Sequence, residues 1–445
     1  MKWKLVFSGD GYARLRSELL ASSPAEAGAI LLCNRSFGGR LLVASVSIAG
    51  ATDCSIQGPD RLEFAPEFLA RAVKRARDND QALILVHTHP FSDQPEFSFV
   101  DDGGEAVAIP AIAARAPKGP HGALVLGRAG FRGRIYEGSR AEQITAITEV
   151  GPDVVVHGIG HSTAIEEIHD RNVRAFGAAG QTILAGAVVG VVGLGGTGSL
   201  IAEQLARLGV GELILIDDDT LATTNLNRVV GAYSADVGRP KVKVAQDHVA
   251  RITNERTRTE AVVGSVLHKG AAERLFRCDL IFCCTDTHGS RAVLNQLAYQ
   301  HWLPTIDMGV RIDANDGQIS AMAGRVQMLA PGLACLQCEN LLDPEAVRRD
   351  LLTDSERKAD PYIVGEASPQ PAVISLNGTV ASLAITTFLA AVVGLPARTR
   401  RLNYRVAEGV VRPVATEPNP TCIVCSEQRG AAGQGDRWPI FWRRD

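Results

Sequence analysis

A short run of glycines has the spacing of a phosphate-binding loop. Residues 193–198 read GLGGTG, with Gly193, Gly195, Gly196 and Gly198 placed between an apolar run and a helical pattern. Backbone N–H groups in such a loop, and the N-terminus of the helix that follows, bind phosphate groups. Asp217 ends the next apolar run and is placed to hold a ribose hydroxyl. This pattern alone fits a dinucleotide and ATP equally well.

Four further polar residues favour ATP over a dinucleotide. Asn225, Arg228 and Lys241 follow Asp217, and Asp286 ends a third apolar run. A triphosphate that is about to lose pyrophosphate needs fixed cations, because charge develops on the leaving group. The Asp286 carboxylate could hold the accompanying Mg²⁺. A nicotinamide-dependent oxidoreductase remains the alternative, although it would leave the amide and both cations without a purpose.

Two C-x-x-C pairs suit a structural metal. They are Cys335 with Cys338 and Cys422 with Cys425, among nine cysteines in all. Four thiolates are typical of tetrahedral Zn²⁺. The pairs are far apart in the sequence, so this zinc would join the C-terminal end of its domain to a distant segment.

A second group of metal ligands lies in the segment LILVHTHPFSDQPEFSFVDD. His87 and His89 are two residues apart at the end of an apolar strand and therefore point the same way. Asp101, at the start of a helix, can complete three ligands and leave one position open, as in catalytic zinc sites. Glu26 is placed by chain order to act as general base, and Ser98 to steady an oxyanion. These roles predict zinc-assisted hydrolysis of an amide bond.

The elements that must position the histidine site form a mixed α/β domain over residues 1–145. Residues 27–48 alternate apolar runs with a Gly turn and predict a β-hairpin, and 66–80 predict a helix. A buried strand over 81–90, another helix and two strands within 121–138 complete this domain.

The second domain is expected over 166–430, after a glycine-rich linker at 146–165 and before a tail at 431–445. Three apolar runs, AVVGVVG, ELILIDDD and DLIFCCTD, alternate with helical patterns and predict a Rossmann-like, mostly parallel sheet. Ligands bind such sheets beyond the carboxyl ends of the strands, where the glycine loop, Asp217 and Asp286 lie.

Composition argues against several other classes of function. The net charge is −3 and the Lys and Arg residues form no long basic run, so no nucleic-acid partner is expected. We expect no membrane association, because we find no stretch of about eighteen apolar residues and the first residues, MKWKLVFSGDGY, lack a signal-peptide core. The protein is expected to be cytoplasmic.

Residues 171–425 resemble the ThiF/MoeB-like adenylating superfamily, which includes ubiquitin-activating enzymes. The resemblance rests on RNVRAFGAAGQTIL, VVGLGGTGS, LIDDDT, TNLNR, the lysine loop GRPKVKVA, CTDTHGSR and the paired C-x-x-C motifs. It implies that the glycines bind ATP together with five polar side chains, and that the last of these organises Mg²⁺ and catalysis. These five are Asp217, Asn225, Arg228, Lys241 and Asp286.

The same resemblance implies a reaction and partners. In that family, the C-terminal glycine carboxylate of a ubiquitin-like or sulfur-carrier protein attacks the α-phosphate of ATP, and an acyl adenylate and pyrophosphate result. Arg174 matches an arginine that reaches across a homodimer to the partner's ATP. The adenylate would then pass to a conjugating enzyme or to a sulfur donor.

One feature departs from family members that form a thioester on a cysteine between the two zinc pairs. Residues 339–421 contain no cysteine. Cys283 and Cys284 lie within an apolar strand, where a buried structural role is expected. Ser368 lies just before a segment that resembles the helix after the family's cysteine loop, so an oxyester on this serine is an alternative acceptor.

Residues 1–145 resemble the JAB/MPN-type metalloprotease domain through His87, His89, Pro90, Ser98 and Asp101, together with an upstream acid, Glu26. In that family these residues cut the peptide or isopeptide bond after a ubiquitin-like C-terminus.

Both resemblances point to the tail of a ubiquitin-like protein. The leading hypothesis is a bifunctional enzyme of a bacterial conjugation pathway, which adenylates the terminal glycine with MgATP and uses zinc to process or deconjugate the same modifier. Activation of a sulfur carrier for cofactor or thio-metabolite biosynthesis is the alternative. A third possibility is a scaffold with a silent adenylation domain joined to a protease.

Overall fold

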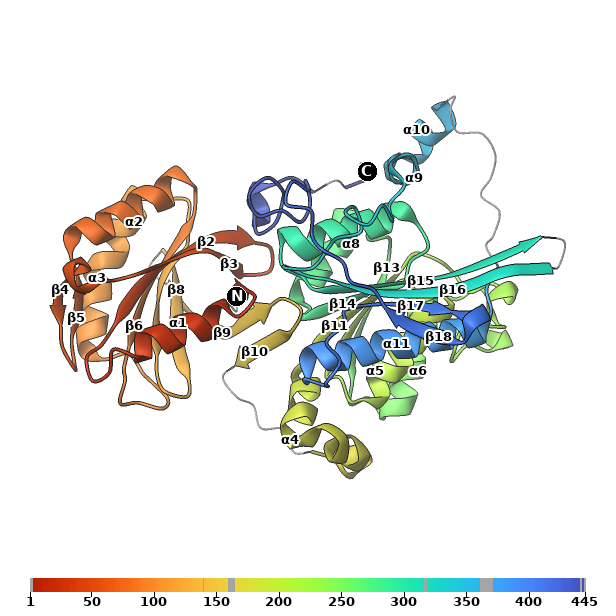
Figure 1. The fold of residues 1–445 in the computed structure, drawn as a ribbon, viewed down its shortest axis with the longest axis horizontal. Helices are drawn as coiled ribbons and strands as arrows, with labels where there is room; N and C mark the ends of the chain where they lie inside the picture. Colours follow the sequence, from red (N-terminus) through yellow and green to blue (C-terminus); the bar gives the residue numbers. More distant parts are fainter. Residues whose placement is uncertain are drawn as a thin grey trace. The chain divides into compact units, whose positions relative to one another are not determined.

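The computed structural model describes residues 3–138, 140–158, 165–315, 318–360, 371–440 and 442–443. The chain forms two compact units (Figure 1). Unit 1 consists of Met1–Val150, Val155–Gly160 and Gly433–Pro439. Unit 2 consists of Gly151–Val154, His161–Ala432 and Ile440–Asp445.

Unit 1 is built on a closed, mixed β-barrel. Its sheet has the order β1-β3-β2-β6-β7-β8-β9-β10, and β1 also pairs in parallel with β9, which closes seven of the strands into a ring. The strands are β1 Trp3–Ser8, β2 Gly28–Ser36, β3 Arg40–Ile48, β6 Ala82–Thr88, β7 His121–Leu126, β8 Phe131–Glu137, β9 Arg140–Val150 and β10 Val154–Gly158. A hairpin of β4 Cys54–Gln57 and β5 Leu62–Phe64 stands apart from this sheet.

Three helices cover the barrel: α1 Gly11–Leu20, α2 Pro66–Asp78 and α3 Phe99–Arg115. Strand β2 is buried on both faces, because Leu31 belongs to the core cluster that includes α1, and Ile30 and Leu32 to the cluster with α2 and α3. This explains why its sequence is a continuous apolar run rather than an alternation.

The predicted elements of this half are confirmed. The hairpin expected over 27–48 is β2 and β3, joined by a turn in which Gly38 and Gly39 have φ of 72° and 74°. The segment expected to be a linker, 146–165, includes the end of β9 and all of β10.

Unit 2 contains a second eight-stranded sheet, of order β13-β12-β11-β14-β15-β16-β17-β18. Neighbours from β13 to β15 run parallel, and those from β15 to β18 run antiparallel. The strands are β11 Val188–Val192, β12 Glu212–Asp217, β13 Arg258–Val263, β14 Leu280–Cys283, β15 Thr305–Asn315, β16 Gln318–Leu329, β17 Arg401–Arg405 and β18 Val410–Pro413. This confirms the α/β, Rossmann-like sheet expected from the sequence.

The helices of unit 2 are α4 Asp170–Gly186, α5 Gly196–Arg207, α6 Lys241–Thr253, α7 Lys269–Ala272, α8 His288–Gln300, α9 Pro344–Leu351, α10 Asp354–Ala359 and α11 Ile374–Val392. Short 3-10 turns lie at Ala51–Asp53, Glu167–His169, Thr223–Asn225, Ser234–Asp236, Glu273–Arg277, Val406–Glu408 and Gly435–Arg437. Strand β11 has β12 on one side and β14 on the other, so the strand order reverses there. A ligand crevice is expected at the carboxyl ends of these three strands.

Helix α11 corrects one expectation. It is long and apolar enough to cross a membrane by length and composition, whereas the sequence was expected to contain no such segment. In the structure it packs against α5, β15 and β16, and about half of it is buried, as in a core helix. Length and composition alone do not distinguish these two roles.

Candidate functional site

A cavity of about 560 Å³ lies in unit 2 at the carboxyl ends of β11, β12 and β14. Its lining brings together residues from separate loops of the sheet. Those expected to bind ATP are Gly193, Gly195, Gly196, Asp217, Asn225, Arg228, Lys241 and Asp286. The predicted residues therefore converge on one cavity large enough for a nucleotide.

Two glycines shape the loop that opens this cavity. Gly193 has φ of 87°, and a Cβ there would lie 2.8 Å from the carbonyl oxygen of Cys284. A Cβ on Gly198 would lie 1.8 Å from the carbonyl oxygen of Gly193, so only glycine allows α5 to begin this close to the loop. The first N–H groups of α5 have no partner within the helix and can bind an anion in the cavity.

Asp217 is fixed at the end of β12. Its carboxylate accepts hydrogen bonds from the N–H groups of Leu194, at 2.6 Å, and Asp219, at 2.8 Å. Burial raises its pKa, and these hydrogen bonds and the nearby Lys241 oppose that rise. The acid thus ties the glycine loop to β12 beside the expected ribose position.

The cations and the amide are held by local contacts. Lys241 Nζ lies 2.6 Å from a carboxylate oxygen of Asp219, and its other N–H donors can bind a phosphate in the cavity. Arg228 donates to the carbonyl of Thr224 at 2.7 Å, and the side-chain oxygen of Asn225 accepts from the N–H of Ala222 at 3.0 Å.

The remaining residues that the sequence singled out in unit 2 were not expected to contact the ATP of their own chain. Arg174 is exposed on α4 and pairs with Asp170 at 2.7 Å, so its role toward a second chain stays a prediction. Ser368 lies outside the described residues. Cys283 is fully buried, and burial raises its pKa to about 12. Burial also raises the pKa of Cys284 well above its usual value, in line with structural roles for both thiols.

Among the lining residues that were not predicted from the sequence are two arginines and an amide: Arg291, Arg443 and Asn377. Arg291 stands in the quoted CTDTHGSR motif, and the nearby Asp307 raises its pKa. Asn377 is the one amide in a helical segment whose other residues are apolar or small and hydroxylated, and this composition could have indicated it. Arg443 is anchored by its N–H to the carbonyl of Leu267 at 2.9 Å, and no pattern in the tail indicated this.

The four cysteines of the two C-x-x-C pairs meet in one cluster. Sγ of Cys335 lies 3.6 Å from that of Cys338 and 3.6 Å from that of Cys422, and Cys338 and Cys425 are 3.4 Å apart. A tetrahedral Zn²⁺ with bonds of about 2.3 Å separates its sulfur ligands by about 3.8 Å. The donor set and its spacing therefore fit one structural zinc ion.

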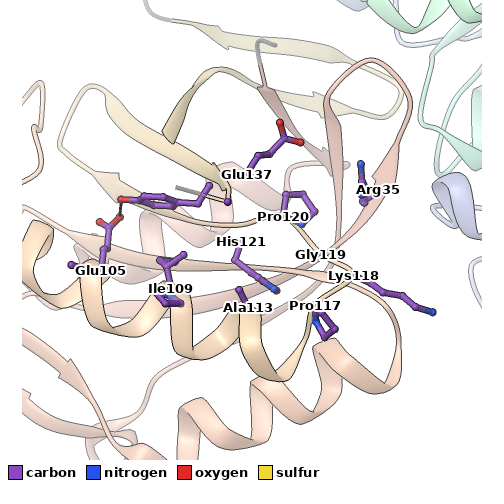
Figure 2. A pocket seen from close by; sticks show the side chains of 14 residues that line it. Arg35, Glu105, Ile109, Ala113, Pro117, Lys118, Gly119, Pro120, His121 and Glu137 are labelled. Carbon is purple, nitrogen blue, oxygen red and sulfur yellow. Dashed lines mark hydrogen bonds between the residues drawn. The ribbon is translucent and has the colours of Figure 1, made fainter. Parts of the chain in front are cut away.

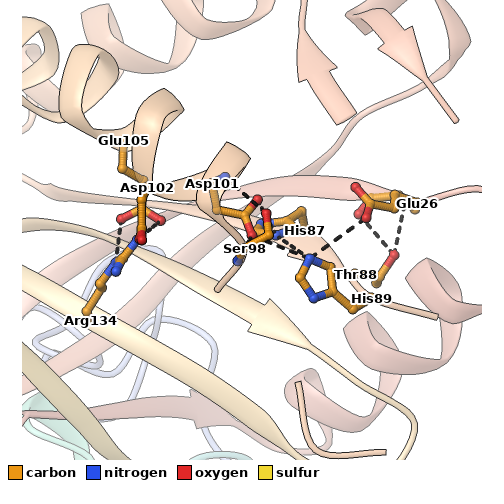
Figure 3. Close-up of polar contacts among 10 residues, drawn as sticks. Glu26, His87, Thr88, His89, Ser98, Asp101, Asp102, Glu105 and Arg134 are labelled. Atoms are coloured by element: carbon orange, nitrogen blue, oxygen red, sulfur yellow. Dashed lines mark hydrogen bonds and ion pairs between the residues drawn. The ribbon is translucent and has the colours of Figure 1, made fainter. Parts of the chain in front are cut away.

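A second ligand cluster lies in unit 1 (Figure 3). Nε2 of His87 lies 3.2 Å from Nε2 of His89 and 3.1 Å from Oδ1 of Asp101. Nitrogen ligands on one tetrahedral Zn²⁺ are about 3.3 Å apart, so three converging donors fit a single ion. Glu26 is 6% exposed, with its carboxylate 3.8 Å from Nε2 of His89.

Charges in this cluster affect one another. Burial raises the pKa of Glu26, although the two imidazoles oppose the rise. Burial would also raise the pKa of Asp101, but hydrogen bonds with both histidines hold it well below its usual range. Ser98 is the N-cap of α3, accepting from the N–H of Asp101 at 3.2 Å, so its hydroxyl is engaged in the cap.

The first turn of α3 is anchored to the barrel by Arg134 (Figure 3). This arginine on β8 lies 2.6 Å from Asp102 and 2.7 Å from Glu105, and its guanidinium is 3.9 Å from the ring centre of Phe97. Of the two adjacent acids, Asp102 faces Arg134, while Asp101 faces the histidines.

Unit 1 contains a cavity of about 430 Å³, which lies between α3 and strands β7 and β8 (Figure 2). The imidazole of His121 lines it but is 1% exposed, accepting from the N–H of Leu83 and bonding the carbonyl of Ala116. None of the predicted site residues that the structure describes lines this cavity.

Comparison with known proteins assigns most of unit 2 to a protein family. The ThiF family model matches residues 169–424. The SAMP-activating enzyme E1 of Haloferax volcanii is 29% identical over 253 residues, which cover 56% of this chain and 84% of that protein. The molybdopterin-synthase adenylyltransferase of Salmonella typhimurium is 32% identical over 257 residues, which cover 57% and 93%. Ubiquitin-like modifier-activating enzyme 5 of Oryza sativa subsp. japonica is 31% identical over 164 residues, which cover 34% and 37%.

Proposed function

The chain belongs to the ThiF family, and from this premise we propose that unit 2 uses ATP to adenylate the C-terminal glycine of a ubiquitin-like or sulfur-carrier protein. The observation that carries the proposal is the convergence of the glycine loop, Asp217, Asn225, Arg228, Lys241 and Asp286 on one cavity. The named activities of the relatives, activation of SAMP, of molybdopterin synthase and of a ubiquitin-like modifier, support the same reaction class.

The geometry suggests how each group acts. The N-terminus of α5 holds phosphate through backbone N–H groups, and Asp217 holds the ribose. Arg228 and Lys241 stabilise the charge that grows on pyrophosphate as it leaves. Asp286 would hold the magnesium that accompanies ATP, which neutralises phosphate charge when bound.

Mass spectrometry tests this reaction directly. Purified ubiquitin-like and sulfur-carrier proteins ending in Gly-Gly are incubated with the enzyme and MgATP, and the expected product is one carrier with added AMP. The Lys241→Ala variant should form it at least about 100-fold more slowly. A wild-type protein that binds ATP but adenylates none of the carriers would count against the proposal. Addition of AMP to the sulfur carriers but to none of the other ubiquitin-like proteins would favour sulfur transfer over conjugation.

A second function is proposed for unit 1: hydrolysis of the bond after the same C-terminus, as in JAB/MPN-type metalloproteases. It is supported by the convergence of His87, His89 and Asp101 with the buried Glu26 beside them. The first three would hold the zinc, which supplies an activated water when bound. Glu26 is placed to accept a proton, and the backbone of this acid is held on both sides: its N–H donates to Gly58 at 2.7 Å and its carbonyl accepts from Gln57 at 3.0 Å.

Metal analysis separates the two sites. Wild type should contain about two zinc ions per chain, and the His87→Ala/His89→Ala double variant about one. Wild type with a single zinc would remove the hydrolase proposal and leave the adenylation proposal intact. Cleavage of a carrier extended beyond its terminal glycine should disappear in Glu26→Gln while both zinc ions remain.

A further inference from the structure

Asn377 is a buried amide that opens into the nucleotide cavity. It lies in the first turn of α11 and is 2% exposed, yet it lines the cavity. Its backbone N–H bonds to the carbonyl of Val373, while its side-chain amide has no hydrogen-bond partner in the described part of the chain. The amide is not among the fully enclosed polar atoms without a partner, so it is open to the cavity. A ligand in the cavity can therefore take a hydrogen bond from it in place of solvent.

The neighbours of this amide are the groups that bind phosphate. A Cβ built on Gly196 would lie 2.2 Å from Nδ2 of Asn377 and 3.2 Å from Cδ of Arg228. Gly196 is the first residue of α5, a helix of 12 residues. The amide therefore faces the N-terminus of α5, and any larger residue at position 196 would fill the space between them.

The order of groups along the cavity indicates which phosphate of the expected ATP lies beside Asn377. Asp217, at the end of β12, marks the ribose side, and the N-terminus of α5 lies next to it after β11. The phosphate adjoining the ribose is the α-phosphate, so this phosphate is the one that lies at the N-terminus of α5. Asn377 stands beside that position.

We propose that Asn377 is a catalytic residue of the adenylation reaction, whose Nδ2 donates a hydrogen bond to a non-bridging oxygen of the α-phosphate. This inference rests on the proposed adenylating function of unit 2. A carboxylate oxygen of the carrier forms a bond to the α-phosphorus as the bond from that phosphorus to the oxygen bridging to the β-phosphate breaks. The electron pair leaves on pyrophosphate, and the amide stabilises charge on the non-bridging oxygens throughout.

Binding of AMP and of adenosine to the full chain tests the contact without turnover. Asn377→Asp has the same shape but carries a negative charge, so it should weaken AMP binding about tenfold or more, while adenosine affinity changes by less than about twofold. Asn377→Leu should weaken AMP binding by a smaller factor. Equal losses for AMP and adenosine would mean a structural role, and unchanged AMP affinity in Asn377→Asp would also overturn the proposal.

Kinetics provide the second readout. In carrier-dependent pyrophosphate exchange, Asn377→Leu should lower kcat about 100-fold, with KM for the carrier within about threefold of wild type. Ser375→Ala, on the exposed side of the same turn, is the matched control and should behave as wild type. Asn295→Leu controls for the loss of a buried structural asparagine, because Oδ1 of Asn295 accepts from the N–H of Leu336 and leucine removes that acceptor. This variant should leave the ratio of AMP affinity to adenosine affinity as in wild type. If wild type binds AMP but supports no exchange, the proposed function fails while the AMP comparison still tests Asn377.

Discussion

Oδ1 of Asp101 lies 3.1 Å from Nε2 of His87, which places a carboxylate from the start of α3 against an imidazole at the end of β6. The adjacent Asp102 turns away to Arg134. Asp101→Asn should therefore lower zinc affinity at the unit 1 site by more than about 100-fold, whereas Asp102→Asn should leave its zinc in place. Metal content after dialysis measures this difference. Equal zinc loss in both variants would show that the first turn of α3, rather than the Asp101 carboxylate, decides binding.

Glu203 predicts a pH-dependent contribution to stability. Burial would raise its pKa, but hydrogen bonds from Arg207 on α5 and His248 on α6 lower it. For an acid whose pKa is lowered by folding, the stabilisation is present above its ordinary pKa and is lost as pH falls through the lowered value. Glu203→Gln should cost about 0.5–1 kcal/mol of unfolding free energy at about pH 6 and a smaller amount at about pH 3.5, below the ordinary pKa of the carboxyl. Urea unfolding measures both values, and a cost independent of pH would contradict this account.

The location of the cysteines predicts that no thioester forms on unit 2. Residues 339–421 contain no cysteine, and Cys283 and Cys284 have pKa values raised by burial, which disfavours the thiolate. With ATP and carrier, non-reducing gels should show no adduct that dithiothreitol removes. Peptide mapping of any alkali-sensitive adduct tests Ser368 as an oxyester acceptor. A thiol-sensitive adduct on either cysteine would refute the prediction.

Arg174 predicts complementation between chains. If this exposed arginine serves the partner's nucleotide, Arg174→Ala and Asp286→Ala are each inactive alone, but a mixed dimer has one intact site. Equal mixing of subunits should then restore about a quarter of wild-type exchange activity. No recovery, in a mixture shown by mass spectrometry to contain mixed dimers, would place Arg174 outside the partner's site.

The sequence predicted local features well and long-range ones less well. Apolar runs identified β2, β6, β11 and β12, because burial on both faces removes polar residues from a strand. Closure of the barrel pairs β1 with β9, two segments that lie far apart in the sequence, and no local period indicates such pairing. The glycine loop has a spacing typical of phosphate-binding loops, so the sequence alone predicted that it binds a ligand, and Gly193, Gly195 and Gly196 line the cavity.

The residues that the sequence missed depend on packing. Asn377 reaches the cavity because α11 packs against α5, and Arg134 anchors α3 because β8 brings it beside Asp102 and Glu105. The sequence predicted Asp101 as a ligand, but the position of the adjacent Asp102 against Arg134 follows only from the first turn of α3, whose helical geometry turns adjacent side chains to different faces. Spacing alone does not fix these directions.

The measurement that tests the central claim most directly is ATP–pyrophosphate exchange in the presence of carriers that end in glycine. The account predicts exchange that requires the carrier and falls about 1000-fold or more in Asp286→Ala. Because the Asp286 side chain is exposed at the cavity, this variant should fold and keep its structural zinc. Exchange that persists in Asp286→Ala, or its absence in a wild-type protein that binds ATP, would contradict adenylation at this site.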